Sequence, residues 1–122
     1  MSRVSRTITI IDDDPAVLDS TRFLLEVYDF EVLTYRSGLE FLAEGPDMDC
    51  LIVDYQMPGM NGLEFLSELR KCGNEAPAIM MSATVSPTLQ RQAAELGIKR
   101  VLEKPLSNQE LLRAIEEELL QS

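Results

Sequence analysis

The sequence predicts an α/β protein of the doubly wound type, in which a parallel sheet carries helices on both faces. Short runs of β-branched and aliphatic residues alternate with helical patterns five times along 122 residues, as in a (βα)5 chain. The central run, residues 51–53, is apolar without interruption and has acidic residues on both sides. Strands buried on both faces of a parallel sheet have this character.

Five strands are expected, because five short runs are rich in residues that favour extended backbone. They lie at residues 7–11, 31–35, 51–53, 77–81 and 99–103. Polar side chains follow four of them. Asp12 and Asp13 come after the first strand, Asp54 after the third, Ser82 after the fourth and Lys104 after the fifth.

A helix is expected after each strand. The helices lie at residues 15–28, from 37 to 45–46, from 61 to 72–73, from 86–87 to 97, and from 107 to the C-terminus. Pro15 suits the first turn of a helix capped by Asp14. The apolar positions of this helix predict a buried face of Val17, Thr21, Leu24, Leu25 and Tyr28. Three other helices begin with the pattern of a capping box: Ser37 with Glu40, Asn61 with Glu64, and Ser107 with Glu110.

The expected topology brings the acidic residues together. Right-handed crossovers place helices on both faces of the sheet. In a flavodoxin-like fold the strand order is 2-1-3-4-5, and ligands bind at the switch point between strands 1 and 3. Since parallel strands end at the same edge of the sheet, this order would place Asp12 and Asp13 beside Asp54.

Composition excludes several classes of function. A net charge of −10 and a pI near 4.4 would repel nucleic-acid phosphates and anionic lipids, so we expect this domain to bind neither nucleic acid nor membrane directly. Because no long apolar segment is present, we expect neither a transmembrane helix nor a signal peptide. Cys50 and Cys72 have no CxxC or zinc spacing, which indicates free thiols and a cytoplasmic location. Histidine is absent, so imidazole catalysis is excluded.

The remaining chemistry must use carboxylates, lysine, hydroxyls and a metal bound through oxygen. Three close carboxylates repel one another unless a cation lies between them. Hard oxygen ligands suit Mg²⁺, which also accepts phosphate oxygens. Each residue has a plainer alternative: residues 12–14 as a solvated turn and N-cap, Lys104 as a structural ion-pair partner, and Ser82 as an ordinary hydroxyl at a strand end.

Four segments together carry a family resemblance. IIDDDP, VDYQMPGMNG, MMSA and LEKPL, in this order and spacing, resemble the receiver domain of two-component response regulators. The resemblance implies that Asp54 is the nucleophile that accepts a phosphoryl group, with Lys104 and Ser82 as the other catalytic residues. It implies Mg²⁺ held by Asp13, Asp54 and the backbone carbonyl of Gln56, with Asp12 acting through water. The phosphoryl oxygens would bind Ser82, Ala83 and Lys104.

The same resemblance implies partners. The phosphoryl donor would be a sensor histidine kinase or a phosphotransfer protein, and the readout would use the face formed by strand 4, helix 4, strand 5 and helix 5. A downstream effector domain or protein would receive the signal, and phosphorylation could drive homodimer formation. The domain would catalyse its own phosphorylation and dephosphorylation without turning over an external substrate. Residues 1–122 form one domain, either a complete regulator or a receiver excised from a longer one.

The sequence departs from the family pattern at two positions. Val101 stands where receivers usually carry an aromatic residue, and Ser82 where threonine is commoner. Pro105, after the lysine, is expected to be cis by resemblance, although trans is the usual state. Two alternative functions stay open: a pseudo-receiver that only binds partners, and a phosphatase of the haloacid dehalogenase type. The latter is prompted by Asp12-x-Asp14, but a further acidic pair and a cap domain are lacking.

Overall fold

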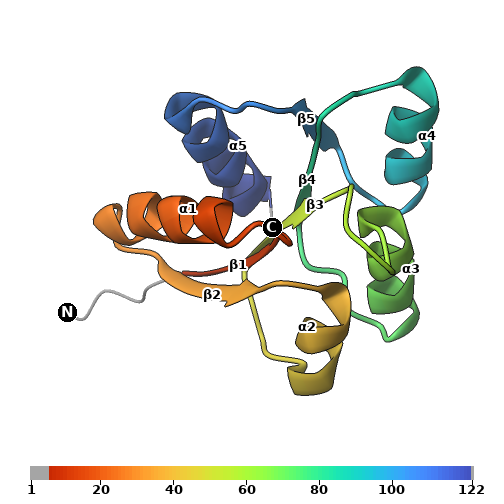
Figure 1. The fold of residues 1–122 in the computed structure, drawn as a ribbon, viewed down its shortest axis with the longest axis horizontal. Helices are drawn as coiled ribbons and strands as arrows, with labels where there is room; N and C mark the ends of the chain where they lie inside the picture. Colours follow the sequence, from red (N-terminus) through yellow and green to blue (C-terminus); the bar gives the residue numbers. More distant parts are fainter. Residues whose placement is uncertain (1–5, 122) are drawn as a thin grey trace.

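A five-stranded parallel sheet lies between two layers of helices (Figure 1). The structure is a computed structural model and describes residues 6–121. The strands are β1 (Thr7–Ile11), β2 (Glu31–Tyr35), β3 (Cys50–Asp54), β4 (Ala78–Ser82) and β5 (Arg100–Glu103). The helices are α1 (Pro15–Val27), α2 (Gly38–Glu44), α3 (Gly62–Lys71), α4 (Pro87–Glu95) and α5 (Asn108–Gln121). Helices α1 and α5 cover one face of the sheet, and α2, α3 and α4 cover the other.

The strand order is β2-β1-β3-β4-β5 with every neighbouring pair parallel, so the predicted flavodoxin-like fold is confirmed. The first two strands match the predicted ranges, and the other three differ from them by one residue at one or both ends. The central strand begins at Cys50 and includes Asp54. This strand pairs with β1 on one side and β4 on the other, which puts its carboxyl end in the middle of the sheet edge.

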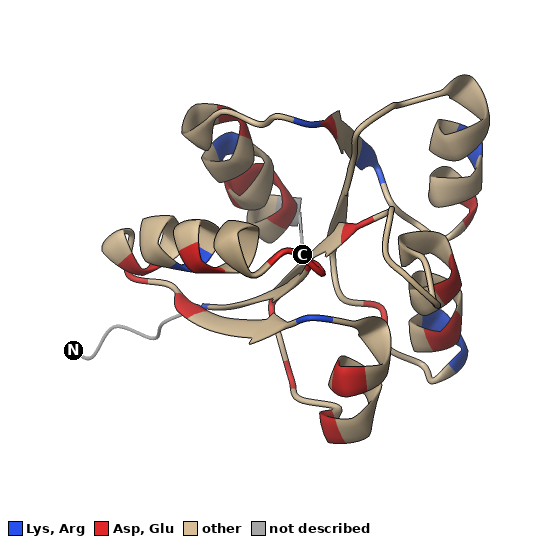
Figure 2. Ribbon diagram, viewed as in Figure 1, with Lys and Arg blue, Asp and Glu red and all other residues tan. Residues whose placement is uncertain are grey.

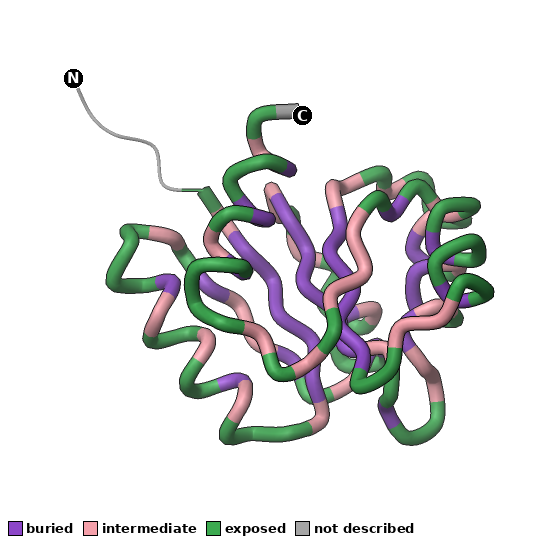
Figure 3. Tube along the Cα trace, turned by 90° about the horizontal axis from the view of Figure 1, so that it is seen from above, coloured by how far each residue is buried: buried purple, intermediate pink, exposed green. Residues whose placement is uncertain are grey.

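Alternating side chains divide the core into two clusters, as the geometry of a strand requires. In β3, Cys50 and Ile52 belong to the cluster beneath α1 and α5. Leu51 and Val53 belong to the cluster beneath α2, α3 and α4. Every residue of β3 is buried, and Figure 3 shows buried residues concentrated on the central strands. The continuous apolar run therefore reflects burial on both faces of the sheet.

Side chains cap the helices largely as predicted. The Asp14 carboxylate accepts a hydrogen bond from the amide of Ala16, and Asn61 with Glu64 forms a complete capping box. At α2 the box is incomplete. The Ser37 hydroxyl accepts from the amide of Glu40, but the Glu40 carboxylate accepts from the amide of Arg36, one residue before the cap. That prediction was therefore only half right.

The buried face of α1 differs from the prediction. Leu18 and Leu25, which are two turns apart, are buried against the sheet. Tyr28 lies beyond the last helical residue and is 54% exposed. Val17, Thr21 and Leu24 are only partly buried, because they line a hollow between α1 and α5. Helical spacing predicted the helix correctly, but the face that packs against the sheet is rotated from the predicted one.

Charged residues lie mainly in the helices and near the ends of the strands (Figure 2). Acidic residues outnumber basic ones by 21 to 11 over the whole chain. Cys50 is buried and Cys72 is exposed, both as free thiols. Within residues 6–121, no helix is both long and apolar enough to cross a membrane.

Two local features place the loops at the carboxyl edge of the sheet. The amide of Gly62 donates to the carbonyl of Tyr55 at 2.9 Å, which folds the β3–α3 loop back onto the strand. A Cβ atom at Gly62 would lie 2.7 Å from the Asp54 carbonyl oxygen, so only glycine fits without displacement. After β5, the Lys104 amide donates to the Ser82 carbonyl at 2.8 Å. The Lys104–Pro105 peptide bond is cis, as the resemblance implies.

Candidate functional site

Three carboxylates meet at the switch point of the sheet. Asp12 and Asp13 follow β1, and Asp54 ends β3; one oxygen from each lies within 4.8 Å of the others. Asp12 is fully buried, Asp54 is 3% exposed, and Asp13 is half-buried. The strand order predicted this convergence. Asp14 does not join the cluster, because its side chain is exposed and caps α1.

Lys104 supplies the positive charge that faces this cluster. Its Nζ atom lies 3.2 Å from Oδ2 of Asp54 and 3.3 Å from Oδ2 of Asp12. The lysine follows β5, two strands away from β3, and its side chain reaches back across the edge of the sheet. With three carboxylates and one ammonium group, the cluster carries two net negative charges when all four groups are ionised.

Burial and charge shift the pKa of two groups. Burial, followed by repulsion from Asp12, raises the pKa of Asp54. Lys104 and the Gln56 amide, which donates to Oδ1 of Asp54 at 3.3 Å, act in the opposite direction but do not cancel the rise. Burial would lower the pKa of Lys104, but Asp12 and Asp54 outweigh it and raise that pKa. The fold therefore disfavours the charged form of Asp54 and favours that of Lys104.

The donor set fits a hard divalent cation. Three carboxylates offer oxygen ligands close together, and Mg²⁺ prefers oxygen ligands while keeping several waters. A divalent cation would also neutralise the two remaining negative charges of the cluster. The residues predicted as metal ligands, Asp12, Asp13 and Asp54, are therefore suitably placed, and Gln56 follows two residues after Asp54.

The predicted phosphoryl-binding donors lie beside the cluster but bond to other groups in this structure. The Ser82 hydroxyl donates to the Thr84 carbonyl at 2.7 Å and accepts from the Thr84 amide at 3.3 Å. The Ala83 amide donates to Oε1 of Gln56 at 3.2 Å. Sequence reasoning missed this last contact, because it depends on how closely two loops approach each other.

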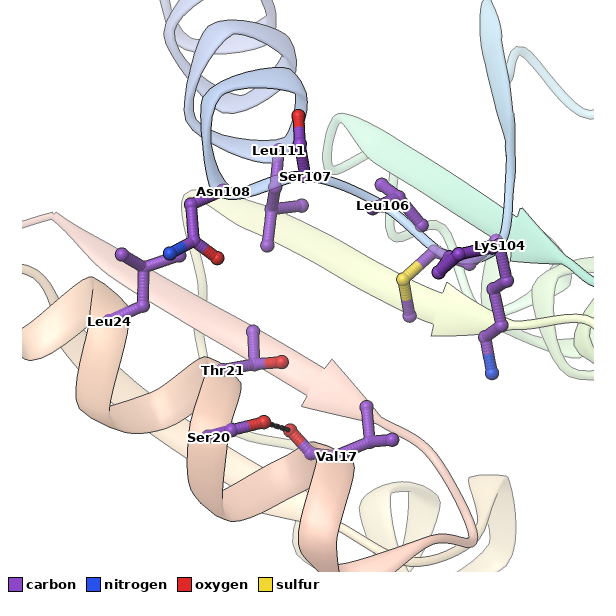
Figure 4. A pocket seen from close by; sticks show the side chains of 11 residues that line it. Val17, Ser20, Thr21, Leu24, Lys104, Leu106, Ser107, Asn108 and Leu111 are labelled. Carbon is purple, nitrogen blue, oxygen red and sulfur yellow. Dashed lines mark hydrogen bonds between the residues drawn. The ribbon is translucent and has the colours of Figure 1, made fainter.

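A hollow of about 500 Å³ opens next to Lys104, between α1 and the segment from β5 to α5 (Figure 4). Val17, Thr21 and Leu24 line it from α1, and Leu111 lines it from α5. Its lining is mainly apolar, and Lys104 lies at one end. Sequence reasoning missed this hollow, because it counted the same α1 residues as core.

Residues 8–116 match the model of the response regulator receiver domain. The chain belongs to this family. The receiver domain spans nearly all of the described residues, from β1 into α5.

Relatives with known names support the same assignment. The receiver domain is 36% identical to the transcriptional regulatory protein FixJ of Azorhizobium caulinodans over 91% of this chain and 54% of that protein. It is 32% identical to FixJ of Bradyrhizobium diazoefficiens over 94% of this chain and 57% of that protein. The chain thus spans about half the length of the curated relatives it matches.

Solved structures show the same fold. The receiver domain superposes on a CheY-like receiver domain protein from Methanospirillum hungatei with a TM-score of 0.90 and 30% identity, covering 97% of this chain and 96% of the other. The response regulator StyR gives a TM-score of 0.86 and 32% identity, covering 97% of this chain and 61% of the other. The chain is therefore a receiver domain in both sequence and fold.

Proposed function

We propose that this receiver domain is a phosphorylation switch in which Asp54 accepts a phosphoryl group. The contact between Lys104 and Asp54, beside Asp12 and Asp13, is the observation that carries the proposal. A carboxylate at the mouth of a loop, with a cation 3.2 Å away, is placed to attack a phosphorus atom whose oxygens the cation can neutralise.

The chemical step transfers a phosphoryl group from a donor to Asp54. An ionised oxygen of Asp54 forms a bond to phosphorus, the bond from phosphorus to the donor atom breaks, and its electron pair leaves with the donor. The product is an acyl phosphate on Asp54. Lys104 would pair with the phosphoryl oxygens, and the Ser82 hydroxyl and Ala83 amide would donate hydrogen bonds to them. Asp12, Asp13, Asp54 and the Gln56 carbonyl would hold Mg²⁺, and the charge of the ion would help to neutralise the same oxygens.

A phosphohistidine donor must lie outside this sequence, since the sequence contains no histidine. We propose a phosphohistidine on a sensor kinase or phosphotransfer protein, in keeping with the family. The apolar hollow is a suitable binding site for the donor protein, because Lys104 lines the hollow and also contacts Asp54. Phe23 and Val27 extend this surface along α1, where they are 71% and 63% exposed.

The remaining parts of the proposal concern the output. The phosphorylated domain would signal through the face formed by β4, α4, β5 and α5, to an effector domain or a separate protein, with homodimer formation as one route. The curated relatives are about twice as long as this chain, which is consistent with a receiver of residues 1–122 joined to an output domain. The acidic charge argues against direct nucleic-acid binding by the receiver, and we propose a cytoplasmic location.

Of the alternatives, the phosphatase reading loses its main support. It depends on Asp14 as a second catalytic carboxylate, but Asp14 is exposed and its oxygen accepts a hydrogen bond from the Ala16 amide. The pseudo-receiver reading is supported by no feature of the site, since Asp13, Asp54 and Lys104 are all present.

Intact mass spectrometry after incubation with acetyl phosphate and Mg²⁺ tests the proposal. The wild type should gain the mass of one phosphoryl group, and Asp54→Asn should gain none. Asp14→Asn is the matched control: asparagine caps helices as well as aspartate does, so labelling should persist. Labelling that survives in Asp54→Asn but disappears in Asp12→Asn would overturn the proposal and favour the phosphatase chemistry.

A further inference from the structure

The side chain of Gln56 joins two loops that meet at the phosphorylation site. Gln56 lies on the β3–α3 loop, and its Oε1 atom accepts a hydrogen bond from the Ala83 amide of the β4–α4 loop at 3.2 Å. A backbone amide can only donate, so the atom of the carboxamide that faces it must be the oxygen. The contact connects residues 27 positions apart in the sequence.

The backbone of the same residue contacts the proposed nucleophile. The Gln56 amide donates to Oδ1 of Asp54 at 3.3 Å. Gln56 therefore bonds to the phosphoryl acceptor through its main chain and to a proposed phosphoryl-binding amide through its side chain.

Both proposed phosphoryl-binding donors, at the end of β4 and the start of the β4–α4 loop, already have acceptors within the protein. The Ser82 hydroxyl donates to Thr84, and the Ala83 amide donates to Gln56. An amide has one hydrogen, so a phosphoryl oxygen can take a full bond from Ala83 only when the carboxamide of Gln56 releases it.

We infer, on the basis of the proposed phosphorylation of Asp54, that the Gln56 side chain is a latch that holds the β4–α4 loop in its unphosphorylated position. The latch occupies the Ala83 amide, and the phosphoryl group must displace it. A charged phosphoryl oxygen forms a stronger hydrogen bond than a neutral carboxamide, so displacement is favourable. Gln56 and Ala83 are exposed, and the released carboxamide is hydrated at once. The latch therefore weakens phosphoryl binding only slightly. The β4–α4 loop closes on the phosphoryl group only after the hydrogen bond between Gln56 and Ala83 has broken.

Gln56→Met removes the latch, since methionine matches the length of glutamine but accepts hydrogen bonds only weakly. Gln92→Met, on the exposed surface of α4, is the matched control. Without a phosphoryl group or metal, the Ala83 amide hydrogen should exchange with solvent about fivefold faster in Gln56→Met than in the wild type, as measured by NMR. With Mg²⁺, Gln56→Met should bind beryllofluoride about two- to fivefold more tightly. Gln92→Met should match the wild type in both measurements.

Gln56→Glu separates the hydrogen bond from the size of the side chain. Glutamate keeps an oxygen acceptor, so the Ala83 amide should stay protected, while the added negative charge should weaken beryllofluoride binding. Unchanged Ala83 exchange in Gln56→Met, or beryllofluoride affinity equal to or below that of the wild type, would overturn the latch. A wild type that neither binds beryllofluoride nor accepts phosphate from acetyl phosphate would instead overturn the proposed phosphorylation of Asp54.

Discussion

The Nζ atom of Lys104 lies 3.2 Å from Oδ2 of Asp54, and this contact joins the ends of β5 and β3 across β4. Asp54 is almost fully buried, whereas the Lys104 side chain is 28% exposed. The lysine therefore brings a charge from the protein surface to a carboxylate that has little contact with water. Removing either group should have effects on stability as well as on chemistry.

Lys104→Met should destabilise the metal-free protein by about 2 kcal/mol, because two buried carboxylates lose a charged hydrogen-bond partner. The free energy of unfolding in urea at neutral pH measures this change. Lys71→Met is the control, since Lys71 is exposed and pairs with Glu68 on the surface of α3; the loss of stability should be about 0.5 kcal/mol or less. Equal stabilities of Lys104→Met and the wild type would mean that the contacts of Lys104 with Asp12 and Asp54 contribute nothing to the free energy of unfolding.

The pKa of Asp54 predicts a pH-dependent difference between the wild type and Asp54→Asn. Since burial and Asp12 raise the folded-state pKa above its ordinary value of 3.8, the native state binds the Asp54 proton more tightly than the unfolded state does. The resulting stability is present below 3.8 and is lost as the pH rises through the folded-state pKa. Without metal, the wild type should therefore lose stability relative to Asp54→Asn as the pH is raised from about 4 to neutrality.

Urea unfolding of both proteins across this range tests the prediction, because the difference between them isolates Asp54 from the other acidic groups. A wild type that gains stability relative to Asp54→Asn as the pH rises would show that Lys104 outweighs burial at this carboxylate.

Magnesium should stabilise the protein by binding the native carboxylate cluster. At a concentration tenfold above its dissociation constant, Mg²⁺ should add about 1.4 kcal/mol and raise the melting temperature by about 5 °C. Asp13→Ala should reduce this response, and Asp19→Ala, which removes an exposed carboxylate on α1, should leave it intact. Thermal unfolding with and without Mg²⁺ measures the effect; a melting temperature indifferent to Mg²⁺ in the wild type would contradict a metal site.

Gly62→Ala should disturb the site through the backbone. The added Cβ atom would lie 2.7 Å from the Asp54 carbonyl oxygen and 3.0 Å from the Tyr55 Cα, and neither atom can move freely. We expect a loss of about 1–3 kcal/mol in stability and slower labelling by acetyl phosphate. Gly38→Ala is a control for overpacking, because its Cβ would meet the Phe65 ring and not the backbone of the site. Normal labelling in Gly62→Ala would show that the loop relaxes without moving Asp54.

The sequence predicted the features that depend on local pattern and strand order. β-branched runs located the strands, and the order of the sheet brought Asp12, Asp13 and Asp54 together. Features that depend on the fit between distant segments were missed. The inner face of α1 turns Leu18 toward the sheet and leaves Tyr28 exposed, because packing against the sheet fixes the rotation of the helix. The contact between Gln56 and Ala83 likewise depends on the spacing of two loops.

The last prediction concerns Val101, which stands where the family pattern has an aromatic residue. Val101 is half-buried in β5, pairs in register with Met80, and contacts the core beneath α2, α3 and α4. Hollows of about 390 and 360 Å³ adjoin it along α4 and α5. Valine has no ring that could move into space vacated by the Ser82 hydroxyl. A ligand shifts a conformational equilibrium only through differential affinity for its two states, so one contribution to that difference is missing here.

Activation should therefore be concentrated where Ser82 and Ala83 can still close on a phosphoryl group. Hydrogen exchange of the unmodified and beryllofluoride-activated forms should differ most in residues 82–90, with little change in residues 99–103, because exchange reports local opening segment by segment. Activating Asp54→Asn in the same way provides the control, since it lacks the carboxylate that binds beryllofluoride and should show no change. Protection changes in residues 99–103 as large as those in residues 82–90 would show that β5 transmits the signal without an aromatic side chain.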